Sequence, residues 1–242
     1  MIEVENVSVR YIMGDFKDIG LKEYLIRKVK GQMATKEFWA LRDVSFHVEK
    51  GTLLGIIGSN GSGKSTILKV LAGIMPPTKG RITAHGSIAA LLELGAGFDG
   101  DLTVKENIYL RGAMLGYTRE FVDAEYQNII EFSELQEFEE VAYKKLSSGM
   151  KSKLAFSLAS RVNPDILVLD EVLSVGDIGF RKKSENRMRE LMSGGTTTIL
   201  VSHSMGQIRE MCTQVVWLEK GEMRGIGDTK KMCDEYEKYM KK

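Results

Sequence analysis

One short segment constrains the fold more than any other part of the sequence. Residues 58–66 read Gly-Ser-Asn-Gly-Ser-Gly-Lys-Ser-Thr and match the pattern GxxxxGK[ST]. The apolar run Leu53–Ile57 precedes this segment, and a helical pattern over Ser65–Leu71 follows it. Glycines permit a tight turn, so that backbone N–H groups and the positive end of the helix dipole face an anion. The segment therefore predicts a loop that binds a polyphosphate.

We expect each position of this loop to contribute to the phosphate site. The Lys64 ammonium can reach the β- and γ-phosphates, and the Ser65 hydroxyl can bind Mg²⁺. A glycine-rich loop that matched by chance would lack the strand before it and the helix after it. The predicted phosphate-binding residues are Gly58, Ser59, Asn60, Gly61, Ser62, Gly63, Lys64, Ser65 and Thr66.

Further apolar runs predict a parallel sheet that is covered by helices on both faces. These runs are Ile166–Leu169, Thr198–Val201 and Val215–Leu218, and each is continuously apolar rather than alternating. Helical patterns over Phe180–Met192 and Ser204–Met211 lie between them. The alternation of strands and helices indicates an α/β fold.

The stretch from 93 to 163 is nearly all helical in pattern. Thr103 and Glu106 fit a capping box, and another helix is expected to begin near Ser148 and to end before Pro164. We therefore predict one domain over 1–242, with a core at 1–92 and 164–242 and a helical subdomain at 93–163.

Two carboxylates and a histidine follow predicted strands. Asp170 ends the run Ile166–Leu169 and can hold the Mg²⁺ shell, whereas Glu171 can polarise an attacking water. His203 follows Thr198–Val201, where it can hydrogen-bond a γ-phosphate and orient the water. A solvated carboxylate pair and a structural histidine are the alternatives. Their position beside a phosphate loop favours the catalytic interpretation.

Composition excludes several classes of protein. The chain has 34 Lys and Arg against 33 Asp and Glu, and this balance argues against a protein that grips nucleic acid by bulk charge. Two cysteines are too few for a disulfide framework. Met1–Glu5 lacks the features of a signal peptide, and no apolar run approaches the roughly 18–20 residues that span a bilayer. We expect a soluble intracellular chain.

A further motif carries a resemblance to a known family. Residues 146–150 read Leu-Ser-Ser-Gly-Met and precede the acidic strand. Together with the phosphate loop, this order resembles the ATPase subunits of ABC transporters throughout the chain. The family signature is written LSGGQ; here Ser148 replaces the first glycine and Met150 replaces the glutamine. The resemblance implies an α/β P-loop NTPase (RecA-like) core with an inserted helical subdomain and antiparallel β elements.

The resemblance also implies an assembly and its cofactors. In this family the signature acts on ATP held by a partner subunit, so a head-to-tail homodimer with two MgATP between the subunits is expected. Asp177, in the segment Ser174–Asp177, lies where the family has its D-loop and would couple the two ATP sites. The signature residues are Ser147, Ser148, Gly149 and Met150.

At one position the sequence departs from the family pattern, and for one role, the stacking on adenine, it offers several candidate residues. Where the family has a glutamine that contacts the metal, Glu93 is the nearest polar residue. An aromatic ring near the N-terminus is expected to stack on adenine. Tyr11, Phe38 and Trp39 are all candidates, because an insertion at about 12–38 separates them.

That insertion, with residues 93–98 and 143–150, resembles the subfamily that exports lipid-linked polysaccharides such as O antigens and teichoic acids. We expect a subunit at the cytoplasmic face of the inner membrane that drives a separate transmembrane permease, docked near 93–107. Within the insertion, an amphipathic pattern suits either the membrane surface or packing on its own domain. The tail at 230–242 is expected to form a solvated amphipathic helix.

Two other functions remain open. One is the ATPase of another ABC transporter, such as an importer of small solutes; the insertion and the missing glutamine favour export. The other is an ABC ATPase that works without a membrane, in DNA repair or on ribosomes. The repair class carries long coiled coils and the ribosomal class two cassettes, whereas this sequence has a single phosphate loop.

Overall fold

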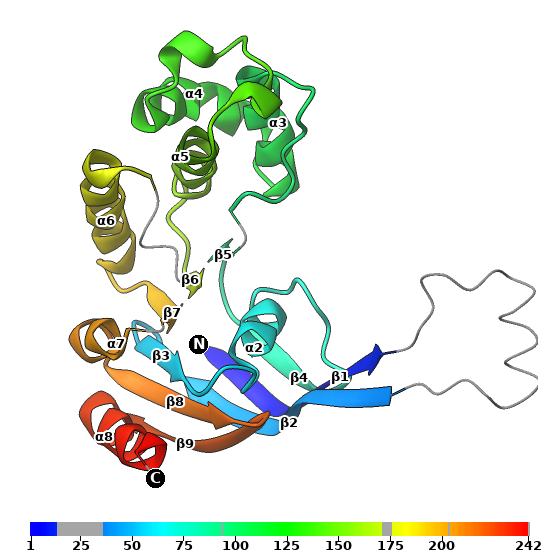
Figure 1. The fold of residues 1–242 in the computed structure, drawn as a ribbon, viewed down its shortest axis with the longest axis vertical. Coiled ribbons are helices and arrows are strands. Elements are labelled where there is room, and N and C mark those ends of the chain that lie inside the picture. The colour runs from blue at the N-terminus through cyan, green and yellow to red at the C-terminus, as the bar shows by residue number, and fades with distance from the viewer. Residues whose placement is uncertain (14–35, 93, 171–175, 203, 242) are drawn as a thin grey trace, which may run out of the picture.

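The computed structural model describes residues 1–13, 36–92, 94–170, 176–202 and 204–241. Over these ranges the chain forms a six-stranded sheet, a three-stranded sheet and a group of helices that stands apart from both (Figure 1). This is the predicted α/β architecture with an inserted helical subdomain and antiparallel β elements.

The six-stranded sheet has the order β5-β6-β7-β3-β8-β9. Strands β5 to β8 in this order pair in parallel, and β9 pairs antiparallel to β8. The four predicted apolar strands are confirmed as β3, β6, β7 and β8. The bounds are β3 (Leu53–Ile57), β5 (Ile88–Leu91), β6 (Ile166–Asp170), β7 (Thr197–Val201), β8 (Gln214–Glu219) and β9 (Glu222–Asp228).

Both faces of the four inner strands β6, β7, β3 and β8 are buried, which explains why these strands read as continuous apolar runs. Alternate side chains point to opposite faces of a strand. Ile166 and Val168 of β6 therefore join one hydrophobic cluster, whereas Leu167 and Leu169 join another.

The first cluster lies between the large sheet, helix α2 (Lys64–Leu71) and the antiparallel sheet β2-β1-β4. These strands are β1 (Ile2–Met13), β2 (Lys36–Val48) and β4 (Lys79–Ala84). Apolar residues of β1 are buried at Val4, Val7 and Val9. The register shifts between Val4 and Val7, and this irregularity breaks the period of two that marks a strand in sequence.

The second cluster lies under α6 (Ile178–Met192), α7 (Met205–Met211) and α8 (Thr229–Met240). The tail forms a helix, as predicted, but the prediction that it is solvated is wrong for one of its faces. Met232 and Cys233 are buried, and the Trp217 ring centroid lies 5.6 Å from that of Tyr236 and 5.1 Å from that of Tyr239. Aromatic packing on β8 holds the helix against the core.

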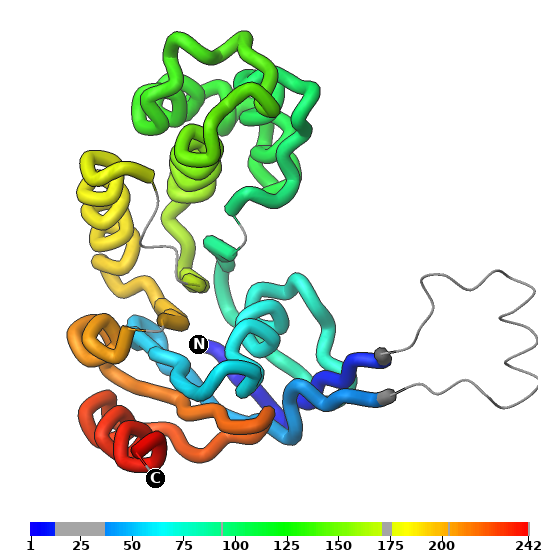
Figure 2. The backbone as a smooth tube through the Cα atoms, viewed as in Figure 1, coloured from blue at the N-terminus to red at the C-terminus, as the bar shows by residue number. Residues whose placement is uncertain are grey.

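The helical group comprises α3 (Val104–Met114), α4 (Arg119–Ser133), two short 3₁₀ turns (Gln136–Phe138 and Tyr143–Lys145) and α5 (Ser148–Ala159). The predicted capping box of Thr103 and Glu106 begins α3. This group has a hydrophobic cluster of its own, but Phe156 and Ala159 of α5 belong to the cluster under α6. Figure 2 shows the chain leaving the large sheet through β5 and returning through β6.

Strands β1 and β2 remain paired as far as Met13 and Lys36. The ends of the predicted insertion at about 12–38 are therefore strand. Its predicted amphipathic helix lies outside the described residues. Among the helices of the described ranges, none is long and apolar enough to cross a membrane.

Candidate functional site

The phosphate loop joins β3 to α2 in a backbone conformation that demands glycine at two positions. Gly58 has φ 152°, and a Cβ there would lie 2.1 Å from the Leu218 carbonyl oxygen. Gly63 has φ 103°, and a Cβ there would lie 2.7 Å from the Ala40 carbonyl oxygen. The loop is therefore packed closely between β2 and β8, where only glycine fits.

The side chain of Lys64 is held over this loop. Its Nζ donates to the Gly58 carbonyl at 2.8 Å and to the Ser59 carbonyl at 2.9 Å, and the residue is 7% exposed. Gly63 precedes α2 and has no side chain with which to cap the first-turn N–H groups. These N–H groups and the ammonium form a positive environment for an anion.

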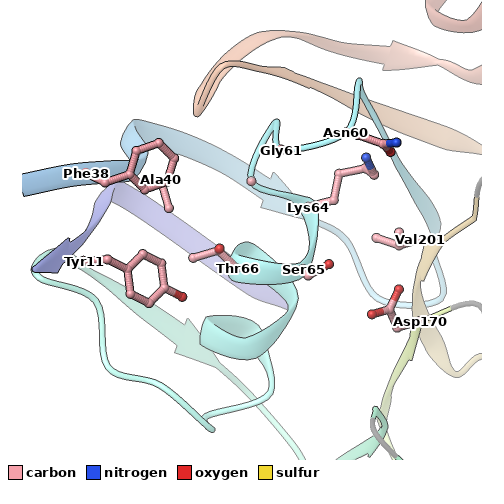
Figure 3. Close-up of a pocket in the computed structure, with 11 residues that line it drawn as sticks. Tyr11, Phe38, Ala40, Asn60, Gly61, Lys64, Ser65, Thr66, Asp170 and Val201 are labelled. Atoms are coloured by element: carbon pink, nitrogen blue, oxygen red, sulfur yellow. The ribbon is translucent and has the colours of Figure 1, made fainter. Parts of the chain in front are cut away.

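A cavity of about 320 Å³ opens above the loop, and Figure 3 shows Lys64, Ser65 and Asp170 around it. Asp170 ends β6 and pairs with Val201 of β7, and β7 lies between β6 and β3. The residues that line the cavity are Tyr11, Phe38, Ala40, Asn60, Gly61, Gly63, Lys64, Ser65, Thr66, Asp170 and Val201.

The predicted Mg²⁺ ligands Ser65 and Asp170 share this cavity. A hydroxyl and a carboxylate are the hard oxygen donors that Mg²⁺ prefers, and the ion usually adds water and phosphate oxygens rather than filling its shell with protein. The donor set therefore fits a magnesium ion that arrives with a nucleotide.

Two of the three candidate aromatic residues also line the cavity. Tyr11 and Phe38 are cross-strand neighbours on β1 and β2, and they lie beside Thr66 in Figure 3. Trp39, the next residue along β2, contacts the Arg10 guanidinium and the Lys79 ammonium at 5.7 and 5.6 Å from its ring centroid. Successive side chains of a strand alternate between faces, so Trp39 is turned away from the site.

Three predicted residues, Glu171, His203 and Glu93, lie outside the described residues. The strands that lead to two of them end at the cavity, because Asp170 and Val201 both line it. For these three positions the predictions made from the sequence stand as proposals.

The signature residues begin α5 rather than lining the cavity. The Ser147 hydroxyl accepts a hydrogen bond from the Met150 N–H at 3.2 Å and so caps the helix. Ser147 and Ser148 are exposed, and Gly149 and Met150 are partly buried. The N–H groups of this first turn are thus presented at a second, separate surface.

Asp177 begins α6 and makes two charge-assisted contacts. Its carboxylate pairs with the Lys153 ammonium at 2.7 Å and accepts from the Phe180 N–H at 3.0 Å. These interactions, the Lys153 hydrogen bond first, lower the pKa of Asp177 to about 2.

Three residues at the site are not among those predicted from the sequence: Ala40 and Val201, which line the cavity, and Glu219, which supports the loop. Glu219 ends β8, is 5% exposed and accepts a hydrogen bond from the Ser59 hydroxyl at 3.0 Å. The Ser59 carbonyl in turn accepts from Lys64, so Glu219 supports the loop that holds the ammonium. The signal was available, because Glu219 follows an apolar strand as Asp170 does.

A glycine loop, a lysine held by that loop and a carboxylate at the end of a nearby parallel strand define a P-loop nucleoside triphosphatase. The inserted helical group narrows the class to the ATP-binding cassettes. The chain belongs to the ABC transporter family, which it matches over residues 41–174.

Curated relatives match along the whole chain. The O-antigen export system ATP-binding protein RfbB of Klebsiella pneumoniae is 42% identical over 242 residues, which cover 99% of this chain and 98% of that protein. The teichoic acids export ATP-binding protein TagH of Bacillus anthracis is 39% identical over 100% of this chain but only 43% of its own length.

Solved structures share the fold. A dimeric post-hydrolysis structure of the ATP-binding cassette MJ0796 with ADP and Pi has a TM-score of 0.71 at 21% identity, and covers 95% of this chain and 99% of that one. An ATP-binding subunit of an ABC transporter has a TM-score of 0.72 at 22% identity, with 98% and 93% covered.

Proposed function

We propose that this ABC ATPase hydrolyses MgATP to export a lipid-linked polysaccharide or teichoic acid through a separate transmembrane permease. The observation that carries the proposal is the similarity to the O-antigen export relative over 98% of that protein's length. We place the subunit at the cytoplasmic face of the inner membrane.

The chemistry assigned to the site follows from its donors. The loop N–H groups and Lys64 bind the triphosphate, and Tyr11 or Phe38 stacks on adenine. Ser65 and Asp170 would hold the magnesium ion, which neutralises phosphate charge when bound. Glu171 orients and polarises the attacking water, and His203 hydrogen-bonds the γ-phosphate. We propose Glu93 as a metal contact because it is the polar residue nearest to the position where the family has a glutamine.

A homodimer would complete each site. The turn at 147–150 carries a helix N-terminus that suits an anion, yet it lies away from its own phosphate loop. A second subunit placed head to tail would bring this turn to the γ-phosphate. A related cassette, MJ0796, has been solved as a dimer.

A groove is the proposed docking surface for the transmembrane permease. It has a volume of about 870 Å³ and lies between β5 and helices α3 and α4. Its lining includes Ile74 and Met114, each 60% exposed, and Ile88 at 39%. Arg111 and Glu125 also line it, which suits an amphipathic cytoplasmic segment of the permease. From the segment 93–107, where docking is expected from the sequence, Ala96 lines this groove.

Substituting Glu171 tests the hydrolytic mechanism. We expect Glu171→Gln to lower ATP turnover by at least about 100-fold, because an amide cannot accept the water's proton. ATP binding should change less than twofold, since the phosphate loop is intact. Phosphate release and binding of a fluorescent ATP analogue measure the two effects. Near-normal turnover would remove Glu171 from the role of base.

Charged substitutions in the groove test the proposed docking of the permease. We expect Ile74→Glu with Met114→Glu to abolish co-purification of a multi-spanning membrane protein from native membranes in mild detergent, with ATP binding unchanged. Leu110→Glu is the matched control, because Leu110 is 38% exposed on α3 and does not line the groove.

Mass spectrometry of the unaltered complex separates the three functions. A permease with a lipid-linked sugar supports export, and a permease with a solute-binding protein would indicate an importer. Recovery with nucleic acid or ribosomal proteins would indicate an ABC ATPase that works without a membrane.

A further inference from the structure

Three helices meet at the ammonium group of Lys153. This residue lies one turn into α5, and its Nζ contacts Glu134 at 2.5 Å and Asp177 at 2.7 Å. Glu134 caps the C-terminus of α4, and Asp177 caps the N-terminus of α6. The ammonium also lies 5.3 Å from the ring centroid of Phe180 on α6. One side chain thus joins α4, α5 and α6.

Helix α6 makes two more contacts with the ends of the same helices. The Lys183 Nζ donates to the Phe132 carbonyl of α4 at 2.9 Å. The Arg187 guanidinium donates twice to the carbonyl of Ser160, which caps α5, at 3.0 and 2.8 Å. These cations meet the negative ends of both helix dipoles. Helix α6, which follows the predicted D-loop directly, is therefore attached to the signature helix near the middle of α5, through Lys153, and at its C-terminal cap, through Ser160.

The Lys153 side chain is mostly buried, whereas both of its carboxylate partners are about half exposed or more. The exposed fractions are 13% for the Lys153 side chain, 64% for that of Asp177 and 49% for that of Glu134. Burial opposes the charge, but hydrogen bonds to Asp177 and Glu134 raise the pKa of Lys153 overall. Removal of the ammonium would leave two carboxylates facing each other across the junction of the helices.

We propose that Lys153 is a positioning residue that makes the signature turn at 147–150 and the D-loop residue Asp177 move as one body within a subunit. This rests on the proposed function, in which these two segments face the partner's ATP. The ion pair fixes the direction in which α5 presents its N-terminus relative to α6. Loss of the pair lets the two segments approach the dimer interface independently.

The first test separates positioning from binding. Lys153→Met should lower kcat for ATP hydrolysis at least tenfold, while affinity for a fluorescent ATP analogue changes less than twofold. Lys153→Arg should retain at least a third of kcat, because it keeps the charge. Asp177→Asn should resemble Lys153→Met, and the double variant should lose no more than the worse single variant. Lys182→Met, at an exposed lysine on α6, is the matched control.

A second test does not depend on hydrolysis, so failure of the proposed function remains distinguishable. Spin labels on Ser148→Cys and Ile178→Cys should give one narrow distance distribution by pulsed electron resonance. Ile178 is 86% exposed and tolerates a label. Lys153→Met should broaden this distribution, and Lys182→Met should not. An unchanged distribution, a kcat within twofold for Lys153→Met, or losses that multiply in the double variant would each overturn the proposal. If Lys153→Met does not fold, Glu134→Gln, which removes the other carboxylate partner of Lys153, gives the same reading.

Discussion

Replacement of Lys64 by methionine is expected to lower ATP hydrolysis by about 10²–10³-fold, since one charged donor to the transferring phosphoryl group is removed from a preorganised site. Lys64 is buried, and the Gly58 and Ser59 carbonyls hold its ammonium group, so its position is set before a nucleotide arrives. Methionine has similar length and packs in the same space without the charge. Phosphate release at saturating ATP measures the loss.

Lys50→Met, at an exposed lysine before β3, is the control for the loss of one positive charge. It should leave turnover within twofold. If Lys64→Met retained more than a tenth of the turnover, the lysine would not act on the transferring group.

Gly58→Ala is expected to abolish ATP hydrolysis and to lower the free energy of unfolding. The new Cβ would lie 2.1 Å from the Leu218 carbonyl oxygen and 2.5 Å from the Ser62 Oγ, so β8 or the loop must move. A φ of 152° lies in a region almost confined to glycine and costs an alanine about 1–3 kcal/mol, and overpacking adds about 1–3 kcal/mol. We expect the free energy of unfolding in urea to fall by about 3 kcal/mol or more, with hydrolysis lost.

Gly73→Ala is the matched control for this variant. Gly73 follows α2 at φ 70°, and a Cβ there meets nothing within 4 Å. It carries a conformational cost without the collision, so its unfolding free energy should fall by only about 1–2 kcal/mol and hydrolysis should persist. Equal losses for both variants would show that φ, rather than the close approach of β8, makes glycine necessary at position 58.

Much of the fold could be predicted from short segments of the sequence. The strands β3, β6, β7 and β8 are short apolar runs buried on both faces, and such runs need no knowledge of their partners to be recognised. The capping box at Thr103 was predicted for the same reason, because both of its hydrogen bonds join residues three apart.

The antiparallel sheet was harder to place. Its strand β1 is interrupted by the shift between Val4 and Val7, and exposed residues (Glu3, Asn6, Tyr11 and Ile12) stand among its buried ones. The end helix α8 was predicted as solvated because its charge pattern hides the burial of Met232 and Cys233 against β8 and its neighbours.

At the candidate site, too, local features could be predicted from the sequence, whereas contacts between distant segments could not. The sequence by itself predicted the phosphate loop and Asp170 at the end of a buried strand, because these residues lie within or directly after short segments whose conformations are local. Only the tertiary structure decided that Tyr11 and Phe38 face the cavity while Trp39 does not, since strand register sets the face. It also decided that Glu219 supports Ser59 and that Lys153 meets Asp177. These pairs are distant in sequence, and they meet because sheet order and helix packing bring their elements together.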